Sequence, residues 1–147
     1  MDSKHEKLKV LLVDDDEIIR IYFHDIFWIH GFEKDCELTI TEDLDQAEAV
    51  MADPAKRPDI IFLDLGLPKK VDGRTIIDPK YSFEFTRKIK EDPSLAHIKI
   101  FIFSGHSEAE FREEAKTVHA DGYIDKGENL VTDIVRMIAG LVADSKK

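Results

Sequence analysis

The chain has 147 residues, of which 43% are hydrophobic and 35% charged, and its formal net charge is −10. This length suits one domain with a substantial core, whereas the acidic balance argues against direct nucleic acid binding, which needs a basic patch. No apolar run approaches the roughly 20 residues that span a bilayer, and the N-terminal residues lack the apolar core of a signal peptide. The single cysteine, Cys36, suits a reducing compartment. We therefore expect a cytoplasmic protein.

Short apolar runs alternate along the chain with segments of helical periodicity. Runs rich in β-branched and aromatic residues predict five strands, at Leu8–Val13, Cys36–Ile40, Ile60–Leu63, Ile98–Phe103 and Tyr123–Ile124. Three of these runs show little polar alternation, which is typical of strands covered on both faces. After each strand, apolar residues recur at helical spacing, so five helices are predicted.

Several of the predicted helices carry end signals. Asp43 with Gln46 forms a plausible cap for the second helix, Asp92-Pro93 closes the third, and Ser107–Glu110 has the pattern of a capping box that opens the fourth. Five strands that alternate with five helices imply a doubly wound α/β fold, with a parallel sheet and helices on both of its faces. The chain contains no internal repeat and no linker, so it is predicted to be one domain.

Acidic residues follow two of the predicted strands. Asp14 and Asp15 come directly after the first strand, and Asp64 comes directly after the third. The first and third strands are neighbours in such a sheet, and functional sites of doubly wound folds lie at the carboxyl ends of the strands. The three carboxylates should therefore converge and repel one another. A hard divalent cation with oxygen ligands would relieve that repulsion, and Mg²⁺ is the natural candidate, with Mn²⁺ as a substitute.

Two further strand ends add a hydroxyl and an ammonium group. Ser104 ends the fourth strand, and Lys126 follows the fifth. Together with the acidic residues, this set suits phosphoryl transfer to a carboxylate, in which a metal ion and a lysine neutralise the phosphoryl oxygens.

The chain resembles the receiver domain of two-component response regulators, with a single-domain layout of the chemotaxis type. Five short motifs carry the resemblance, and they occur in order at the expected strand ends: Val13-Asp14-Asp15, Asp64-Leu65-Gly66-Leu67-Pro68, Asp72-Gly73, Ser104-Gly105 and Asp121-Gly122-Tyr123-Ile124-Asp125-Lys126. The resemblance implies a flavodoxin-like fold of strand order 2-1-3-4-5. It also implies one receiver domain over residues 1–147, with a core of about residues 8–143.

The resemblance assigns the acidic residues to phosphorylation and metal binding. Asp64 would accept phosphate from a sensor histidine kinase or a phosphotransfer protein. Asp15 would ligate Mg²⁺ directly and Asp14 largely through water, while Gly66 would offer its backbone carbonyl to the metal. The protein would be a signalling module and not an enzyme in the usual sense, since it would catalyse only its own phosphorylation and slow dephosphorylation.

The resemblance also assigns a switch. Ser104 would bond a phosphoryl oxygen, Lys126 would pair with Asp64 or with the phosphate, and the ring of Tyr123 would swing inward. The signal would pass to a downstream protein through the face of the fourth helix, fifth strand and fifth helix, which is also the expected surface of any homodimer. No contact with nucleic acid or membrane is expected.

Three features depart from the family pattern. Ser104 stands where threonine is more common, and Gly127 stands where a proline is usual, so the geometry after Lys126 is open. Residues Arg74–Phe83 occupy a place where the family has about one residue. We expect them to form an extended loop beside the acceptor, with Ser82 capping the next helix. Their large apolar residues should fold over that helix or form a contact patch; they are Ile76, Ile77, Tyr81 and Phe83.

Three alternatives remain at this point. A phosphatase of the haloacid-dehalogenase type would use the Asp-x-Asp of Asp14–Asp16, but that family places its acceptor on the first strand and needs a different following sequence. A pseudo-receiver would bind proteins without taking phosphate, although every required residue is present. Finally, the chain could be one domain of a larger regulator; no output domain follows the last predicted helix, so we expect signalling by protein contact.

Overall fold

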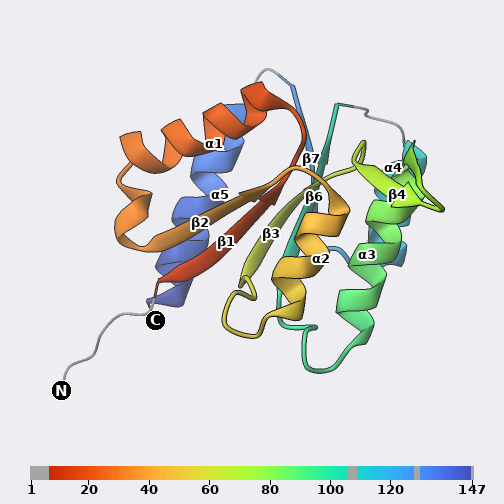
Figure 1. The fold of residues 1–147 in the computed structure, drawn as a ribbon. Coiled ribbons are helices and arrows are strands. Elements are labelled where there is room, and N and C mark those ends of the chain that lie inside the picture. The colour runs from red at the N-terminus through yellow and green to blue at the C-terminus, as the bar shows by residue number, and fades with distance from the viewer. Residues whose placement is uncertain (1–6, 106–108, 128–129, 147) are drawn as a thin grey trace.

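All five predicted strands are present and lie parallel in one sheet. The computed structural model describes residues 7–105, 109–127 and 130–146, and the sheet order is β2-β1-β3-β6-β7 (Figure 1). The strand bounds are β1 Leu8–Val13, β2 Cys36–Thr41, β3 Ile60–Asp64, β6 Lys99–Ser104 and β7 Gly122–Asp125. Counted within this sheet alone, the order is 2-1-3-4-5, which confirms the predicted fold class.

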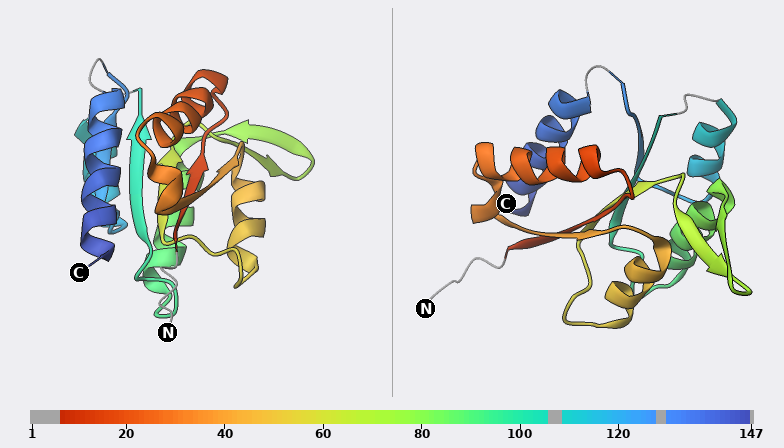
Figure 2. Two further views of the ribbon diagram at one scale, coloured as in Figure 1. Left: turned by 90° about the vertical axis from the view of Figure 1, so that its left-hand side faces the viewer. Right: turned by 45° about the horizontal axis from the view of Figure 1, so that its top comes forward.

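Helices cover both faces of the sheet. Figures 1 and 2 show α1 and α5 on one face and α2, α3 and α4 on the other. Their bounds are α1 Glu17–Ile29, α2 Leu44–Ala52, α3 Pro79–Glu91, α4 Ala109–Thr117 and α5 Leu130–Ser145, with a short 3₁₀ turn at Phe32–Lys34. Every residue of β3 is buried, as expected of a central parallel strand. No helix in the described ranges has both the length and the apolarity for a bilayer span.

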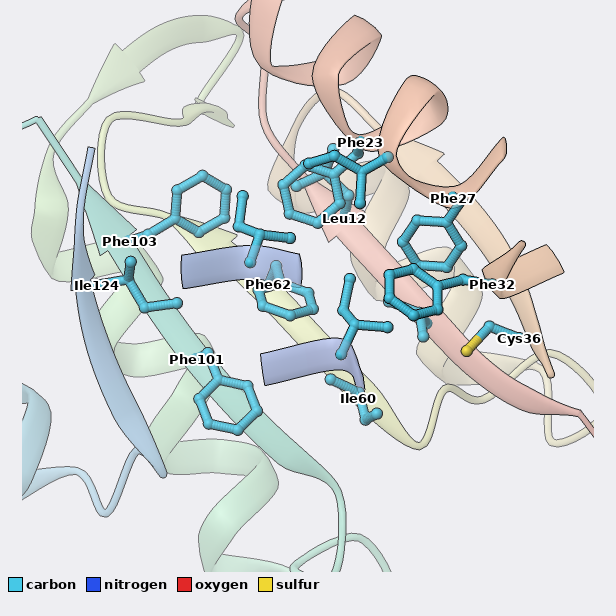
Figure 3. Packing of buried hydrophobic residues seen from close by; sticks show 14 of the residues in the cluster. Leu12, Phe23, Phe27, Phe32, Cys36, Ile60, Phe62, Phe101, Phe103 and Ile124 are labelled. Atoms are coloured by element: carbon cyan, nitrogen blue, oxygen red, sulfur yellow. The ribbon is translucent and has the colours of Figure 1, made fainter. Parts of the chain in front are cut away.

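A cluster of aromatic rings fills the core beneath α1 and α5. Phe23 of α1 packs edge-on against Phe62 of β3, with ring centroids 5.2 Å apart, and stacks on Phe103 of β6 at 5.8 Å (Figure 3). Such pairs contribute about 0.5–1.5 kcal/mol each beyond their buried area. Phe62 lies two residues before Asp64 and Phe103 one residue before Ser104, so this packing also fixes the strand ends that carry the functional residues.

Two of the predicted helix ends are confirmed, the start of α2 at Asp43 and the end of α3 at Asp92-Pro93. The Asp43 carboxylate accepts a hydrogen bond from Gln46 N at 2.8 Å, and the Gln46 side chain accepts one from Glu42 N at 2.8 Å, which is a reciprocal cap of α2. Helix α3 ends at Glu91, directly before Asp92-Pro93. Ser107, the predicted cap of α4, lies outside the described residues.

The segment that follows β3 and its loop differs from the prediction. Strands β4 Pro68–Val71 and β5 Arg74–Ile77 pair antiparallel as a separate hairpin. Asp72 and Gly73 form its two-residue turn with φ of 52° and 77°, the positive values that a type I′ turn requires. The prediction of an extended loop over 74–83 is therefore wrong, because Asp-Gly between two short extended runs is a hairpin signal.

The third helix also begins earlier than expected. Asp78 caps α3 by accepting from Lys80 N at 3.0 Å, and Pro79 occupies the first turn. Ser82, predicted as the cap, instead lies inside the helix and is fully buried. Phe83 joins the core and Tyr81 packs against it, whereas Ile77 remains 64% exposed on the hairpin. The apolar residues of this segment thus divide between the core and the surface.

Charged contacts tie the hairpin to α2. Lys69 Nζ lies 3.2 Å from Asp45 and 3.4 Å from Glu48, and Lys70 N donates to Asp45 Oδ2 at 3.3 Å. Figure 2 (left) shows the hairpin reaching outward past α2. The inserted residues therefore form an ordered projection on the α2–α3 side of the sheet.

Candidate functional site

Three carboxylates meet at the carboxyl edge of the sheet. Val13 of β1 is in register with Leu63 of β3, so the residues that follow them, Asp14 and Asp64, lie side by side. Together with Asp15, they place carboxylate oxygens within 4.8 Å of one another. Asp14 is fully buried, Asp64 is 7% exposed and Asp15 is exposed. The predicted convergence is confirmed, and the three groups differ sharply in solvent access.

Lys126 bridges the two buried carboxylates. Its Nζ donates to Asp64 Oδ1 at 2.9 Å and lies 2.9 Å from Asp14 Oδ2. Its backbone N–H donates to Ser104 O at 2.9 Å, which fixes the loop after β7 against the end of β6. The peptide bond between Lys126 and Gly127 is trans, as are all peptide bonds in the described ranges. The Lys126 ammonium group is therefore held between the carboxylates of Asp14 and Asp64.

The electrostatics of the site are unbalanced. The pKa of Asp14 is raised from 3.8 to about 6, chiefly by burial and next by the nearby charge of Asp64, while Lys126 and a hydrogen bond from Asp16 N oppose the shift. Burial works against the ammonium of Lys126, but the charges of Asp64 and Asp14 outweigh it and raise the lysine pKa. One lysine thus only partly compensates two buried carboxylates and a third at the surface.

A divalent cation fits these residues. Asp14 Oδ1 accepts from Asp16 N at 2.9 Å, but Asp14 Oδ2 is buried and, despite its proximity to Lys126, has no well-aligned hydrogen bond with a described residue. Asp15 adds an exposed carboxylate on the same side. An under-coordinated buried oxygen beside further carboxylate oxygens is a donor set that suits a hard, oxygen-preferring ion.

Gly66, in the loop after Asp64, lies beside the Asp64 carboxylate. A Cβ built on Gly66 would lie 3.7 Å from Asp64 Oδ2, so this oxygen faces the backbone of Gly66, whereas Oδ1 contacts Lys126. Because glycine has no side chain, nothing at position 66 covers Oδ2. The predicted metal ligand Gly66 is thus close to the carboxylates.

One residue of the site was not predicted in its role. Ser82 Oγ donates a hydrogen bond of 2.9 Å to the backbone carbonyl of Asp64, and Ser82 O accepts from Thr86 Oγ1 at 2.9 Å. Both hydroxyl residues are fully buried in α3. In the sequence, the only sign of a shared role is that Ser82 and Thr86 are four residues apart in a helix, and such a spacing is a weak signal. Ser82 anchors the end of β3 and hence the position of Asp64.

The two predicted switch residues lie on adjacent strands. Ser104, the last residue of β6, is 1% exposed and pairs in register with Asp125 of β7. Tyr123, half-buried, packs beneath the guanidinium of Arg112, which lies 4.8 Å from the ring centroid. Arg112 also forms an ion pair with Asp125. A shift of α4, which carries Arg112, would therefore be felt at Tyr123.

The fold and the site together define a signalling receiver. The chain belongs to the response regulator receiver domain family, whose model matches residues 10–138. This assignment supports the receiver over the haloacid-dehalogenase-type phosphatase. A regulatory protein of Pseudomonas aeruginosa is 31% identical over 123 residues, which are 83% of this chain and 51% of that protein. Response regulator Rcp1 of Synechocystis is 31% identical over 85 residues, 58% of this chain and 50% of that protein.

Solved structures give the same assignment. The Mn²⁺-bound form of response regulator Rcp1 is 26% identical, with 91% of each chain covered and a TM-score of 0.67. A CheY-like receiver from Methanospirillum hungatei shares the fold at 19% identity, with 96% and 98% covered and a TM-score of 0.73. The chain spans about half the length of the two curated relatives described above.

Proposed function

We propose that Asp64 is the phospho-acceptor of this receiver domain and takes its phosphoryl group from a histidine kinase or a phosphotransfer protein. The observation that carries the proposal is the Asp64 carboxylate, which is held by Lys126 at 2.9 Å on Oδ1 while Oδ2 faces Gly66, a residue with no side chain to cover it. Oδ2 attacks the phosphorus of a phosphohistidine; the O–P bond forms as the N–P bond breaks and the imidazole leaves. Lys126 stabilises the charge on the phosphoryl oxygens.

Asp14, Asp15, Asp64 and the backbone carbonyl of Gly66 would hold Mg²⁺, with Mn²⁺ as a substitute. When bound, the ion supplies positive charge that offsets both the crowded carboxylates and the phosphoryl oxygens. Asp14 is prearranged by the hydrogen bond from Asp16 N. The exposed position of Asp15 gives a route by which a hydrated ion can enter.

The signal leaves through a conformational change. Phosphate on Asp64 draws the Ser104 hydroxyl toward a phosphoryl oxygen, and the ring of Tyr123 moves inward into the space that this opens. Helix α4, strand β7 and helix α5 then present an altered face to a downstream protein. Self-catalysed phosphorylation and slow dephosphorylation are the only reactions, and residues 1–147 act as one receiver domain in the cytoplasm without contacting nucleic acid.

Labelling by acetyl phosphate in the presence of Mg²⁺ tests the acceptor. Asp64→Asn keeps the shape of the side chain but removes the nucleophilic oxygen, so the phosphoryl group seen by intact mass spectrometry should disappear. Asp72→Asn is the matched control, because Asp72 is exposed in the hairpin turn and asparagine tolerates its positive φ. Full labelling of Asp64→Asn would reject the assignment, and an unlabelled wild type would indicate a pseudo-receiver.

A further inference from the structure

Exposed apolar side chains gather on helix α1. Seven large hydrophobic residues are exposed in the described part of the chain, and five of them lie on this helix: Ile18 at 58%, Ile21 at 49%, Tyr22 at 43%, Trp28 at 72% and Ile29 at 73%. The other two, Ile77 and Val131, lie singly on β5 and α5. Single exposed hydrophobic residues are ordinary, but a contiguous group on one element marks an interaction surface.

The five residues form a second apolar face on a helix that already has one. The inner face of α1 packs on the sheet through Ile19, Phe23, Ile26 and Phe27. The outer residues 18, 21, 22, 28 and 29 are separated by three, one, six and one positions, with Asp25 between them at the same spacing. This is the repeat of a helix–helix packing seam that runs for three turns. We call these five residues and Asp25 the α1 seam.

The size of the α1 seam is near the limit for a monomer surface. Large side chains have full areas of roughly 150–250 Å², so the exposed fractions leave about 600 Å² of largely apolar surface. The largest patch on a typical monomer is about 300–600 Å², and a stable interface buries about 800 Å² on each partner. The α1 seam and its polar rim together approach that value.

We propose that the α1 seam, and not the α4–β7–α5 face that the family resemblance suggested, is the interface of a homodimer in which two α1 helices pack antiparallel across a two-fold axis. An antiparallel alignment places Ile18 level with Ile29 of the second copy and Tyr22 level with Asp25 of the second copy, twice by symmetry. The Tyr22 hydroxyl then donates to the one carboxylate in the seam, and a single polar contact of this kind sets the register of paired helices. The helix dipoles are also antiparallel.

Other occupants fit the seam less well. A protein that only delivers phosphate must reach Asp64, but the two most exposed residues, Trp28 and Ile29, lie about ten positions and roughly 15 Å beyond Ile18 along the helix. A membrane surface is disfavoured because interfacial helices carry basic residues beside their apolar face, whereas the α1 seam is flanked by Asp16 and Glu17 and contains Asp25. The proposed dimer does not depend on phosphorylation of Asp64.

The protein carries its own probe for this interface. Trp28 is the only tryptophan of the chain, so its fluorescence reports directly on the α1 seam. On dilution from about 500 µM to about 1 µM, the emission should shift to longer wavelength at the same concentration at which sedimentation shows dimer converting to monomer. Trp28→Ser and Ile29→Ser should each raise the dissociation constant at least 30-fold, because these are the two most exposed side chains of the α1 seam and both become buried in the dimer.

Matched controls separate the α1 seam from general surface hydrophobicity. Ile77→Ser and Val131→Ser remove exposed apolar groups elsewhere and should leave the dissociation constant unchanged. Tyr22→Phe keeps the ring but removes the hydroxyl and should weaken association about tenfold, which a non-specific contact would not show. All four serine variants should melt within a few degrees of the wild type. A wild type that stays monomeric over the whole range, or a dimer that survives Trp28→Ser but is lost in Val131→Ser, would overturn the proposal.

Discussion

Replacing Asp14 with asparagine should stabilise the metal-free protein. The folded-state pKa of Asp14 is about 6, against 3.8 for an ordinary aspartate. A raised carboxyl pKa contributes stability that is present below pH 3.8 and is lost as the pH rises through 6, because the unfolded chain releases this proton first. The loss over that window is about 3 kcal/mol at one pKa unit per 1.36 kcal/mol. Asparagine has nearly the same shape and carries no charge, so it avoids the loss.

The expected gain depends on pH in a defined way. Burial of the asparagine amide costs part of the advantage, so the free energy of unfolding of Asp14→Asn should exceed that of the wild type by about 1–3 kcal/mol at pH 7. The difference should shrink by about 2 kcal/mol at pH 4.5. For a domain of this size, the gain of about 1–3 kcal/mol at pH 7 corresponds to a melting temperature that is higher by about 3–10 °C.

Urea unfolding in EDTA at several pH values measures this difference, with Asp72→Asn as a control for loss of an exposed acid. Adding Mg²⁺ should reverse the order, because the wild type gains binding free energy and the variant loses a metal-site oxygen. Asp15→Ala should likewise lose the stabilisation by Mg²⁺. A metal-free Asp14→Asn variant no more stable than wild type, or a difference that is the same at pH 4.5 and pH 7, would refute the electrostatic reasoning.

Three further predictions concern positions around the site. Ser82→Ala should lower the free energy of unfolding, measured in urea, by about 1–2 kcal/mol, since the Asp64 carbonyl loses its 2.9 Å hydrogen-bond partner. The same variant should slow acetyl phosphate labelling; an unchanged labelling rate would mean that Ser82 contributes only to stability. Ser104→Ala should still accept phosphate but no longer pass the change to α4, β7 and α5, so beryllofluoride should alter amide hydrogen exchange on that face in the wild type only. Replacing residues 70–77 of the hairpin by a two-residue link should leave the fold and acetyl phosphate labelling intact. Phosphoryl transfer from a protein donor should fall at least tenfold, which corresponds to about 1.4 kcal/mol. Full phosphoryl transfer after the deletion would mark the hairpin as a tolerated insertion.

The sequence by itself was sufficient for the framework of the sheet and for the acidic edge. Apolar runs without alternation mark buried parallel strands, and the strand ends then follow from local signals; β1, for example, has the predicted bounds of Leu8–Val13. Because the ends of neighbouring parallel strands meet, the sequence alone places Asp14, Asp15 and Asp64 together. This inference works because each step depends on residues that are close in sequence.

The tertiary structure decided what depends on residues far apart in the chain. Ser82 reaches Asp64 across 18 positions, and only the packing of α3 against β3 creates that contact. Asp14 and Asp15 are identical side chains in sequence, yet one is buried and the other exposed although their carboxylates converge, and only the packing of other elements around the end of β1 decides this difference. The apolar pattern of α1 likewise could not show which residues face water. A helix has only one face toward the sheet, and the position of that sheet leaves Trp28 and Ile29 outside.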